Sequence, residues 1–288
     1  MKKISGLYIV IVMAVLFGCR KDDNSKLPQL TRVPIPKVTK EAGSSQTIKV
    51  SALSTFAGKI VVDKFFATDI SPKKYDVVII KNADKSVVKT IQADITSFPA
   101  TVNLTADMLS SLFGEPVVTC DFFDVGVNVT TADGTLYQAF PATGVAYGAG
   151  VAAQGGASLT TRYNTEVEFN SAEYSGDFEV VTDEWEDYEP GTVIPVTVIN
   201  DHQVSFEYDA LEAKPIIVDV DLATLKTKVV KQVYGTYNWP YGDASVESVD
   251  GSADNYVAPC EGVLSVRLEH TVAAGSFGDF AIVLKRKE

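Results

Sequence analysis

The stretch "DVGVNVTTADGTLYQAF" (residues 124–140) carries the clearest indication of the fold. Val125, Val127 and Val129 alternate with small or polar residues, which is the period of a strand that buries one face. Asp133-Gly134 follows, and a second run with β-forming residues begins directly after it. Asp-Gly between two such runs predicts a β-hairpin, because this pair suits the tight turns that connect antiparallel strands. We therefore expect a fold built from antiparallel strands.

Similar short runs precede this hairpin. They are rich in Val, Ile and aromatic residues and are separated by Gly, Pro, Asn and Asp, as strands of a sandwich are. The runs are "TIKVSAL" (47–53), "KIVVDKFFA" (59–67), "YDVVIIKNA" (75–83) and "SVVKTIQ" (86–92). One helix interrupts them, with Thr105 as its N-cap, Leu109, Leu112 and Phe113 on one face and Gly114 at its end. About seven strands at this spacing predict an immunoglobulin-like β-sandwich over residues 37–145.

A glycine-rich segment then divides the chain. "GVAYGAGVAAQGGAS" (144–158) carries five glycines and no charged residue, and it interrupts the alternating patterns on either side. Such composition is typical of a linker or a long loop. We therefore predict a linker over residues 146–158 and a second unit over residues 159–288.

The second unit also consists of β-like runs, with Asn200-Asp201 at the place where one run should fold into a hairpin. The closing "GDFAIVLKR" (278–286) echoes "SGDFEVV" (175–181), so we expect the two to pair side by side. That pairing would give a closed or nearly closed antiparallel β-barrel, and a second β-sandwich is the alternative. The runs are "EVEFNSA" (166–172), "GDFEVVTDEW" (176–185), "IPVTVINDHQVSFEY" (194–208), "KPIIVDVDLA" (214–223), "KTKVVKQVYGTY" (226–237), "GVLSVRLEHTV" (262–272) and "DFAIVLKRK" (279–287).

The first residues predict export. Two lysines precede an almost wholly apolar run over residues 6–17, and a small residue, Gly18, stands before Cys19. This pattern predicts a secretory signal peptide over residues 1–18, since the apolar run is too short to span a bilayer. Leu16 to Cys19 resembles a bacterial lipobox, which implies that Cys19 becomes the acylated first residue and anchors the protein in a membrane.

Charge follows Cys19 at once. The residues "RKDD" (20–23) resemble the export signal of surface lipoproteins of the Bacteroidota, which implies an outer-membrane lipoprotein that faces the cell exterior. A plain solvated tether is the alternative. Residues 19–36 are polar and contain three prolines, as an extended spacer should.

Charge is distributed unevenly between the two units. Residues 19–157 carry 14 Lys and Arg against 13 Asp and Glu, whereas residues 158–288 carry 9 against 24. A second unit so acidic, without a basic stripe, argues against nucleic acid as a partner. Besides Cys19 the chain has Cys120 and Cys260, one in each unit, which are either free buried thiols or a disulfide between the units. With so few cysteines and two histidines, we expect no metal site built from them.

Two aromatic-rich segments of the second unit are the best candidates for binding. "TDEWEDYEPG" (182–191) places five carboxylates around Trp185 and Tyr188, and "YGTYNWPYGD" (234–243) contains Trp239 and Tyr241. Nearby Pro and Gly indicate loops, which often carry binding residues. A flat ring offers an apolar face to a sugar, and carboxylates accept hydrogen bonds from its hydroxyls. The alternative is that these rings pack against the barrel.

Other chemistry is less well supported by the sequence. "DGSADN" (250–255) has alternating oxygen ligands that suit calcium, but it lacks the full twelve-residue pattern. The chain contains none of the sequence motifs G-x-S-x-G, H-E-x-x-H or a phosphate-binding glycine loop, and His202 and His270 are both expected to be exposed. Paired carboxylates could hydrolyse a glycoside, but the sequence does not single out a pair. We therefore expect a protein that is not an enzyme.

A second resemblance suggests a function. "FPATVNLTADMLSSLFG" (98–114), a strand that runs into a short capped helix, resembles part of the first domain of accessory glycan-binding proteins of starch-utilisation-type uptake systems. The resemblance implies a non-catalytic protein that holds a polysaccharide or oligosaccharide near an outer-membrane transporter. The first unit would be a spacer and the second would bind the ligand, without a cofactor. The alternatives are a structural or adhesive surface lipoprotein with a protein partner, and a glycoside hydrolase.

Overall fold

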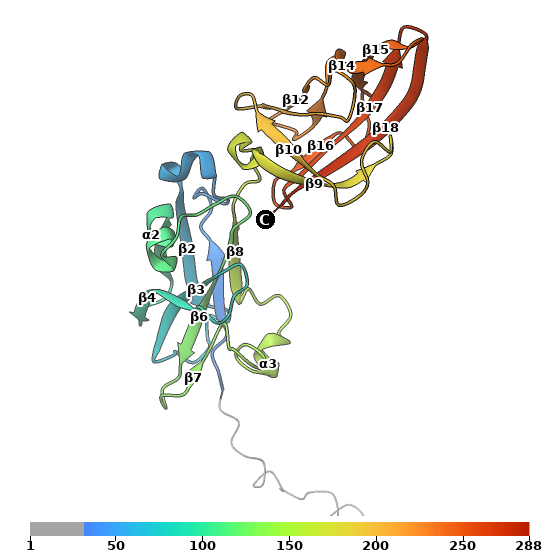
Figure 1. The fold of residues 1–288 in the computed structure, drawn as a ribbon. Helices are drawn as coiled ribbons and strands as arrows, with labels where there is room; N and C mark the ends of the chain where they lie inside the picture. The colour runs from blue at the N-terminus through green and yellow to red at the C-terminus, as the bar shows by residue number, and fades with distance from the viewer. Residues whose placement is uncertain (1–31, 288) are drawn as a thin grey trace, which may run out of the picture.

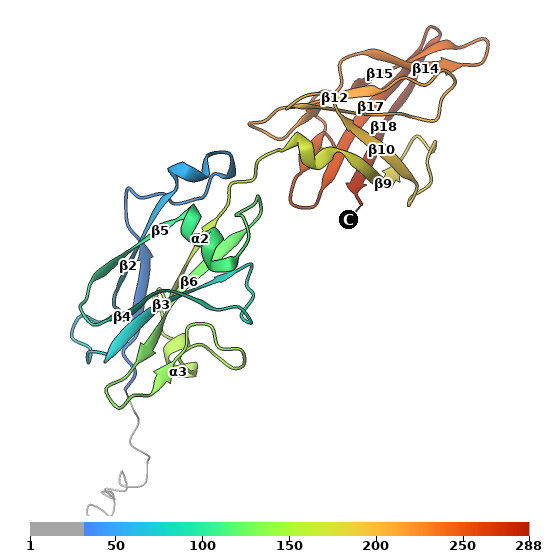
Figure 2. The ribbon, with the colours of Figure 1, turned by 60° about the vertical axis from the view of Figure 1, so that its left-hand side comes forward.

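The computed structural model describes residues 32–287 and shows two all-β units joined end to end (Figures 1 and 2). The predicted signal peptide, Cys19 and all but the last five residues of the predicted tether lie outside the described residues. Those last residues dock on the first unit, where the carbonyl of Ile35 accepts a hydrogen bond from the backbone N–H of Phe65 at 2.8 Å. Among the residues described, no helix has the length and apolar character needed to cross a membrane.

The first unit is a two-sheet sandwich, as predicted. One sheet has the order β1-β2-β5 and the other the order β4-β3-β6-β7, with β8 also paired to β6, all antiparallel. This strand order is that of an immunoglobulin-like sandwich. The strands are β1 (Pro36–Lys40), β2 (Ala57–Lys64), β3 (Lys74–Lys81), β4 (Lys89–Ile95), β5 (Ala100–Thr105), β6 (Phe122–Thr130), β7 (Leu136–Tyr137) and β8 (Thr160–Asn164).

Local sequence signals of this unit are confirmed. The alternating valines of β6 are fully buried between the sheets, and the Asp133-Gly134 turn pairs Val129 with Tyr137, with Gly134 at φ 89°. Helix α2 (Ala106–Phe113) begins where Thr105 accepts a hydrogen bond from the backbone N–H of Met108. It ends at Gly114, which adopts the left-handed conformation that glycine tolerates best.

The predicted linker is in fact part of the first unit. Tyr147 and Val151 are buried in its core, and the hydroxyl of Tyr147 donates a hydrogen bond to the carbonyl of Val127 at 2.7 Å. A short helix, α3 (Ala149–Ala152), follows, and β8 then completes the second sheet. The unit therefore extends to about residue 165, beyond the predicted boundary. Among the glycines and alanines of residues 144–158 stand a few core residues, and these show neither the period of a strand nor that of a helix.

Two predicted strands are wrong. "TIKVSAL" forms only an isolated bridge at Ile48 and then a 3-10 helix (Val50–Thr55), because the carboxylate of Glu168 accepts hydrogen bonds from both the backbone N–H and the hydroxyl of Ser51. "EVEFNSA" crosses between the units and ends in a 3-10 helix (Ser171–Tyr174). In both segments, contacts far along the chain override local β propensity.

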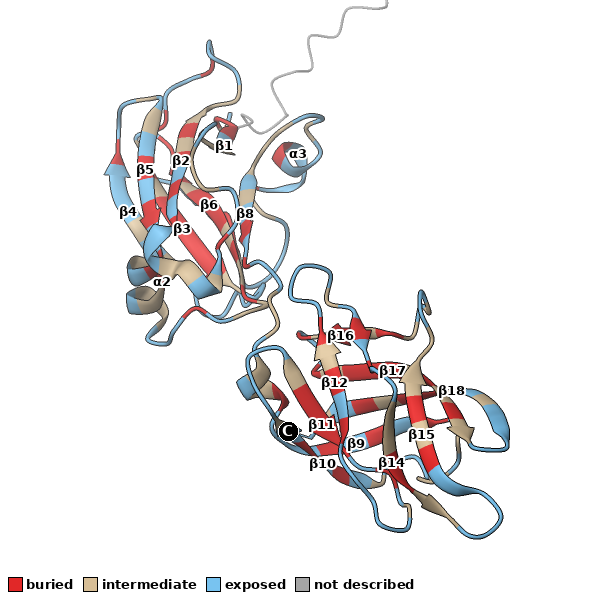
Figure 3. Ribbon diagram, turned by 90° about the horizontal axis from the view of Figure 1, so that it is seen from above, coloured by how far each residue is buried: buried red, intermediate tan, exposed pale blue. Residues whose placement is uncertain are grey.

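The second unit is one antiparallel sheet of ten strands that curls around a single core, and Figure 3 shows its buried face. The order is β13-β12-β11-β10-β9-β18-β17-β15-β14, with β16 paired to β17. The strands are β9 (Gly176–Asp183), β10 (Val193–Val198), β11 (Gln203–Phe206), β12 (Ile216–Val220), β13 (Thr227–Lys228), β14 (Gln232–Tyr237), β15 (Gly242–Ser248), β16 (Tyr256–Ala258), β17 (Val263–Val272) and β18 (Gly275–Arg286).

The curled sheet nearly closes on itself. The expected pairing of β9 with β18 is confirmed, with Lys285 opposite Glu179. The two ends of the strand order also approach each other. The side chain of Gln232 in β14, at one end, donates to the carbonyl and accepts from the N–H of Ile217 in β12, next to the other end. An isolated bridge between Leu211 and Thr236 adds to this contact. Because the edges of one sheet meet, the unit resembles a barrel more than a second sandwich.

The two units are joined covalently at two points. One is the chain between β8 and β9, and the other is a disulfide between Cys120 and Cys260, whose Cα atoms are 5.6 Å apart. Beside the disulfide, the buried carboxylate of Asp121 pairs with Lys81 at 2.9 Å and accepts hydrogen bonds from the N–H of Val118 and the amide of Asn82. The sequence left the state of the cysteines open, and the structure pairs them.

Candidate functional site

The two aromatic-rich segments meet at one pocket. It has a volume of about 440 Å³ and lies at the end of the second unit that is farther from the first unit, beside the β14–β15 turn and the start of β18 (Figure 1). Five of its residues are aromatic. The lining consists of Trp185, Asp187, Tyr237, Asn238, Trp239, Tyr241 and Phe277.

The rings of the pocket are held to different degrees. Trp185 is half-buried and donates a hydrogen bond from Nε1 to the hydroxyl of Tyr237 at 3.1 Å. Its ring centroid lies 5.7 Å from that of Phe277, which in turn lies 5.6 Å from the ring of Tyr241. Trp239 is 94% exposed and stands free at the rim. The pocket therefore combines fixed rings at its base with one ring that is open to a ligand.

Three of the four predicted site residues come together here, and the fourth does not. Tyr188 stacks on Tyr208 with ring centroids 6.0 Å apart, and its hydroxyl donates to the carbonyl of Glu207 at 3.0 Å. Packing thus accounts for this ring. The predicted site did not include four other lining residues, although the first three stand within the two segments: Asp187, Tyr237, Asn238 and Phe277. Phe277 carried no usable signal, because only the β17–β18 pairing brings it to the pocket.

A buried carboxylate shapes the loop that carries Trp185. Asp183, at the end of β9, accepts hydrogen bonds from the backbone N–H groups of Trp185, Asp187 and Tyr188 at 3.0 to 3.1 Å, and from the hydroxyl of Tyr208 at 3.3 Å. Burial raises the pKa of Asp183 above its ordinary value, although these hydrogen bonds favour the ionised form. Asp183 therefore fixes the backbone on which the pocket residues stand.

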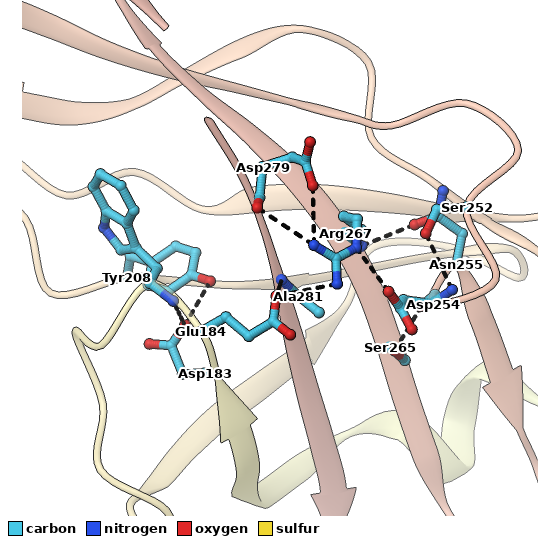
Figure 4. Close-up of polar contacts among 11 residues, drawn as sticks. Asp183, Glu184, Tyr208, Ser252, Asp254, Asn255, Ser265, Arg267, Asp279 and Ala281 are labelled. Carbon is cyan, nitrogen blue, oxygen red and sulfur yellow. Dashed lines mark hydrogen bonds and ion pairs between the residues drawn. The ribbon is translucent and has the colours of Figure 1, made fainter. Parts of the chain in front are cut away.

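Arg267 on β17 braces the same loop (Figure 4). Its guanidinium pairs with Glu184 at 3.1 Å, with Asp254 at 2.7 Å and with Asp279 at 2.9 Å. Glu184 also accepts a hydrogen bond from the N–H of Ala281 on β18 at 2.9 Å. Hydrogen bonds with Asp254 and Asp279 raise the pKa of Arg267, so this cation is fully engaged.

Asp187 differs from these acids. Its Oδ2 atom is shielded from solvent and has no hydrogen-bond partner among residues 32–287. Burial, and next the nearby charge of Asp183, raise the pKa of Asp187 to about 6. An acceptor atom buried without a partner costs free energy, so the carboxylate of Asp187, which lines the pocket, is less well stabilised by the protein than Asp183 is.

His270 lies behind the pocket and is buried, contrary to the expectation that it is exposed. Its ring stacks on Trp185 with centroids 4.2 Å apart, and Nδ1 is 3.1 Å from the hydroxyl of Tyr234. Burial lowers the pKa of His270 to about 4, so the ring is neutral at pH 7. The charged neighbours of His270 in the sequence point away from it, because alternate residues of a strand face opposite sides. His202 lies exposed in its hairpin turn, as predicted.

The predicted calcium loop uses some of its oxygen ligands internally. Asn255 donates to the carbonyl of Val249 at 2.7 Å and accepts from the N–H of Arg267 at 2.8 Å, and Asp254 pairs with Arg267. The loop lines a separate cavity of about 470 Å³ together with Asp219 and Asp221. Within the described residues, no group of three or more His, Cys, Asp or Glu side chains is arranged to hold a metal ion.

Comparisons of this chain with protein-family models, with curated proteins and with solved structures found no match. The geometry of the pocket therefore carries the functional argument.

Proposed function

We propose that this protein is a non-catalytic surface lipoprotein that binds glycan through the aromatic pocket of its second unit, as part of an outer-membrane uptake system. The observation that carries the proposal is the convergence of Trp185, Trp239 and Tyr241 on one open pocket, with Asp187 beside them. Aromatic faces bind the apolar faces of sugar rings, and a carboxylate accepts hydrogen bonds from their hydroxyls.

The placement of the pocket supports the same proposal. The described chain starts at the end of the first unit that is farther from the second unit, whereas the pocket lies at the opposite end of the molecule (Figures 1 and 2). If Cys19 carries the lipid anchor, the first unit would act as a spacer and the pocket would face away from the membrane.

Binding to a panel of soluble polysaccharides tests the proposal. Purified residues 20–288 should be retarded in native gels that contain a bound polysaccharide, and calorimetry with the matching oligosaccharide should give an affinity. Trp239→Ala should weaken that affinity about tenfold or more, because the freely exposed ring loses its contact with the sugar. The fold should be unaffected, since this side chain is 94% exposed.

Phe66→Ala provides the matched control. Phe66 is also an exposed aromatic residue, at 42%, but it lies in the first unit. Its loss should leave glycan affinity unchanged. The proposal fails if no glycan of a broad panel is bound, or if Phe66→Ala weakens binding as much as Trp239→Ala does.

A further inference from the structure

The pocket has a distinctive charge. Its seven lining residues include one ionisable acid, Asp187, and neither lysine, arginine nor histidine. The other lining side chains are five aromatic rings and one amide. The face of an aromatic ring carries a negative potential and attracts a cation that lies within about 6 Å of its centre. Both kinds of group therefore favour a positively charged ligand.

The surroundings of the pocket add negative charge. Tyr188, beside the pocket, reports this charge. Burial, and next the charges of four neighbouring carboxylates, raise the pKa of its phenol. These carboxylates belong to Asp209, Asp187, Asp183 and Glu207. Arg267 is already paired with three carboxylates. Behind the pocket lie the phenols of Tyr208 and Tyr234 and the neutral ring of His270, and the phenol of Tyr237 lines the pocket itself.

Lys231 is the cation on the other side of the β14–β15 hairpin. It lines a neighbouring pocket together with Tyr241 and pairs with Glu247 at 3.3 Å. Its charge is thus directed to a different partner. No lysine or arginine lines the aromatic pocket, so the negative charge of Asp187 has no cationic partner there.

The carboxylate of Asp187, which lines the pocket, distinguishes among ligands. A neutral hydroxyl could donate a hydrogen bond to this carboxylate but would leave its charge unpaired. An ammonium group provides up to three donors and the opposite charge, and the surrounding rings stabilise it further. An acidic sugar would be repelled by Asp187 and by its carboxylate neighbours.

We infer that the pocket selects a sugar that carries a free ammonium group, so that the ligand is a glycan with unacylated amino sugars. Asp187 pairs with the ammonium group, and the rings of Trp185 and Tyr237 flank it. The inference rests on the proposed glycan-binding function and narrows it to one class of sugar.

Two oligosaccharides that differ only in acylation test this inference. A hexamer of β-1,4-linked glucosamine and its fully N-acetylated counterpart are titrated into residues 20–288, just above the pKa of Asp187, which is about 6. The amine hexamer should bind about tenfold more tightly. Asp187→Asn keeps the shape of the side chain and removes its charge, so most of the preference for the amine hexamer should be lost.

Glu189→Gln is the matched control, because Glu189 is an exposed acid of the same loop. It should keep the preference for the amine hexamer. A preference that survives undiminished in Asp187→Asn would reflect general attraction of a polycation to an acidic surface and would overturn the inference. Choline, which has an ammonium group and no sugar ring, should bind far more weakly than the amine hexamer, and equal affinity would overturn the assignment to a sugar.

Failure of the inference can be distinguished from failure of the proposed function. Equal affinity of the unmodified protein for both hexamers, lost in Trp239→Ala, would overturn the ammonium preference and leave glycan binding in place. Binding of other glycans but of neither hexamer would have the same meaning. Absence of binding to every glycan would overturn both.

Discussion

The joint between the two units and the aromatic pocket of the second unit both contain buried acids, but they differ in how far those acids are paired. At the joint, buried Asp121 has a cationic partner and two hydrogen-bond donors, and the disulfide lies next to it. At the pocket, Asp187 keeps one oxygen without a partner, as does Nε2 of buried His270. Both regions place acids among apolar side chains, but only the joint compensates them fully.

This difference separates groups that stabilise a fold from groups that are available to a ligand. A buried charge that is paired and hydrogen-bonded belongs to the structure, and its removal leaves its partners unpaired. A buried polar atom without a partner has no such structural role and lowers stability unless something binds it. The joint should therefore be sensitive to substitution, and the pocket should tolerate it. Three experiments test this difference.

Loss of the disulfide should have the largest effect. Cys120 and Cys260 are separated by 140 residues, and a cross-link over so long a loop lowers the entropy of the unfolded chain by the equivalent of about 5 kcal/mol. The double variant Cys120→Ser, Cys260→Ser should unfold at lower urea concentration. Small-angle scattering should show a broader distribution of distances, because only one chain segment still joins the units.

Glycan affinity serves as the internal control for this variant, since the pocket lies at the far end of the second unit (Figure 1). It should stay unchanged. Identical urea midpoints and scattering profiles with and without the cross-link would show that the joint is held by noncovalent packing instead.

Neutralising Asp121 should have the next largest effect. Asp121→Asn leaves Lys81, whose side chain is only 12% exposed, without one of its two carboxylate partners. Breaking a buried pair in this way should lower the free energy of unfolding by about 3 kcal/mol at pH 7. Urea denaturation measures the loss. A change within experimental error would mean that Glu115, the other partner of Lys81, compensates by itself.

Asp187→Asn should raise the free energy of unfolding, and by less than Asp121→Asn lowers it. The pKa of Asp187 in the folded protein, about 6, lies above the ordinary value of about 4. The folded state therefore holds the proton more tightly, and stability falls as the pH rises from about 4 through about 6. Asp187→Asn removes this loss and should stabilise the protein by about 1 kcal/mol at pH 7.5, after allowance for screening at a half-buried group.

At pH 4 most of the stabilisation should disappear, because Asp187 is then protonated in the folded chain and about half protonated in the unfolded chain. Thermal unfolding at the two pH values measures the difference, with Glu189→Gln as the exposed control. A destabilised Asp187→Asn variant at pH 7.5 would indicate that the carboxylate has a structural partner, as Asp121 has.

Much of the local architecture could be predicted from the sequence. The alternating valines of β6, the hairpins at Asp133-Gly134 and Asn200-Asp201 and the cap at Thr105 are confirmed. Each of these depends on residues a few positions apart, so a short window contains the physical cause. The prediction of a linker at 144–158 is wrong because the cause lies outside such a window. The core residues of this segment are fixed by the sheet on which they pack and show no period of their own.

At the candidate site, too, local properties could be predicted and contacts between distant residues could not. The sequence determined that two aromatic-rich loops lie in an acidic β unit, because composition and turn residues are local properties. Contacts across the folded sheet bring Trp185 to Tyr237, turn Tyr188 away, bury His270 and pair Cys120 with Cys260. These contacts join residues that are distant along the chain, and they depend on the register and curl of a ten-stranded sheet, which no short stretch of sequence encodes.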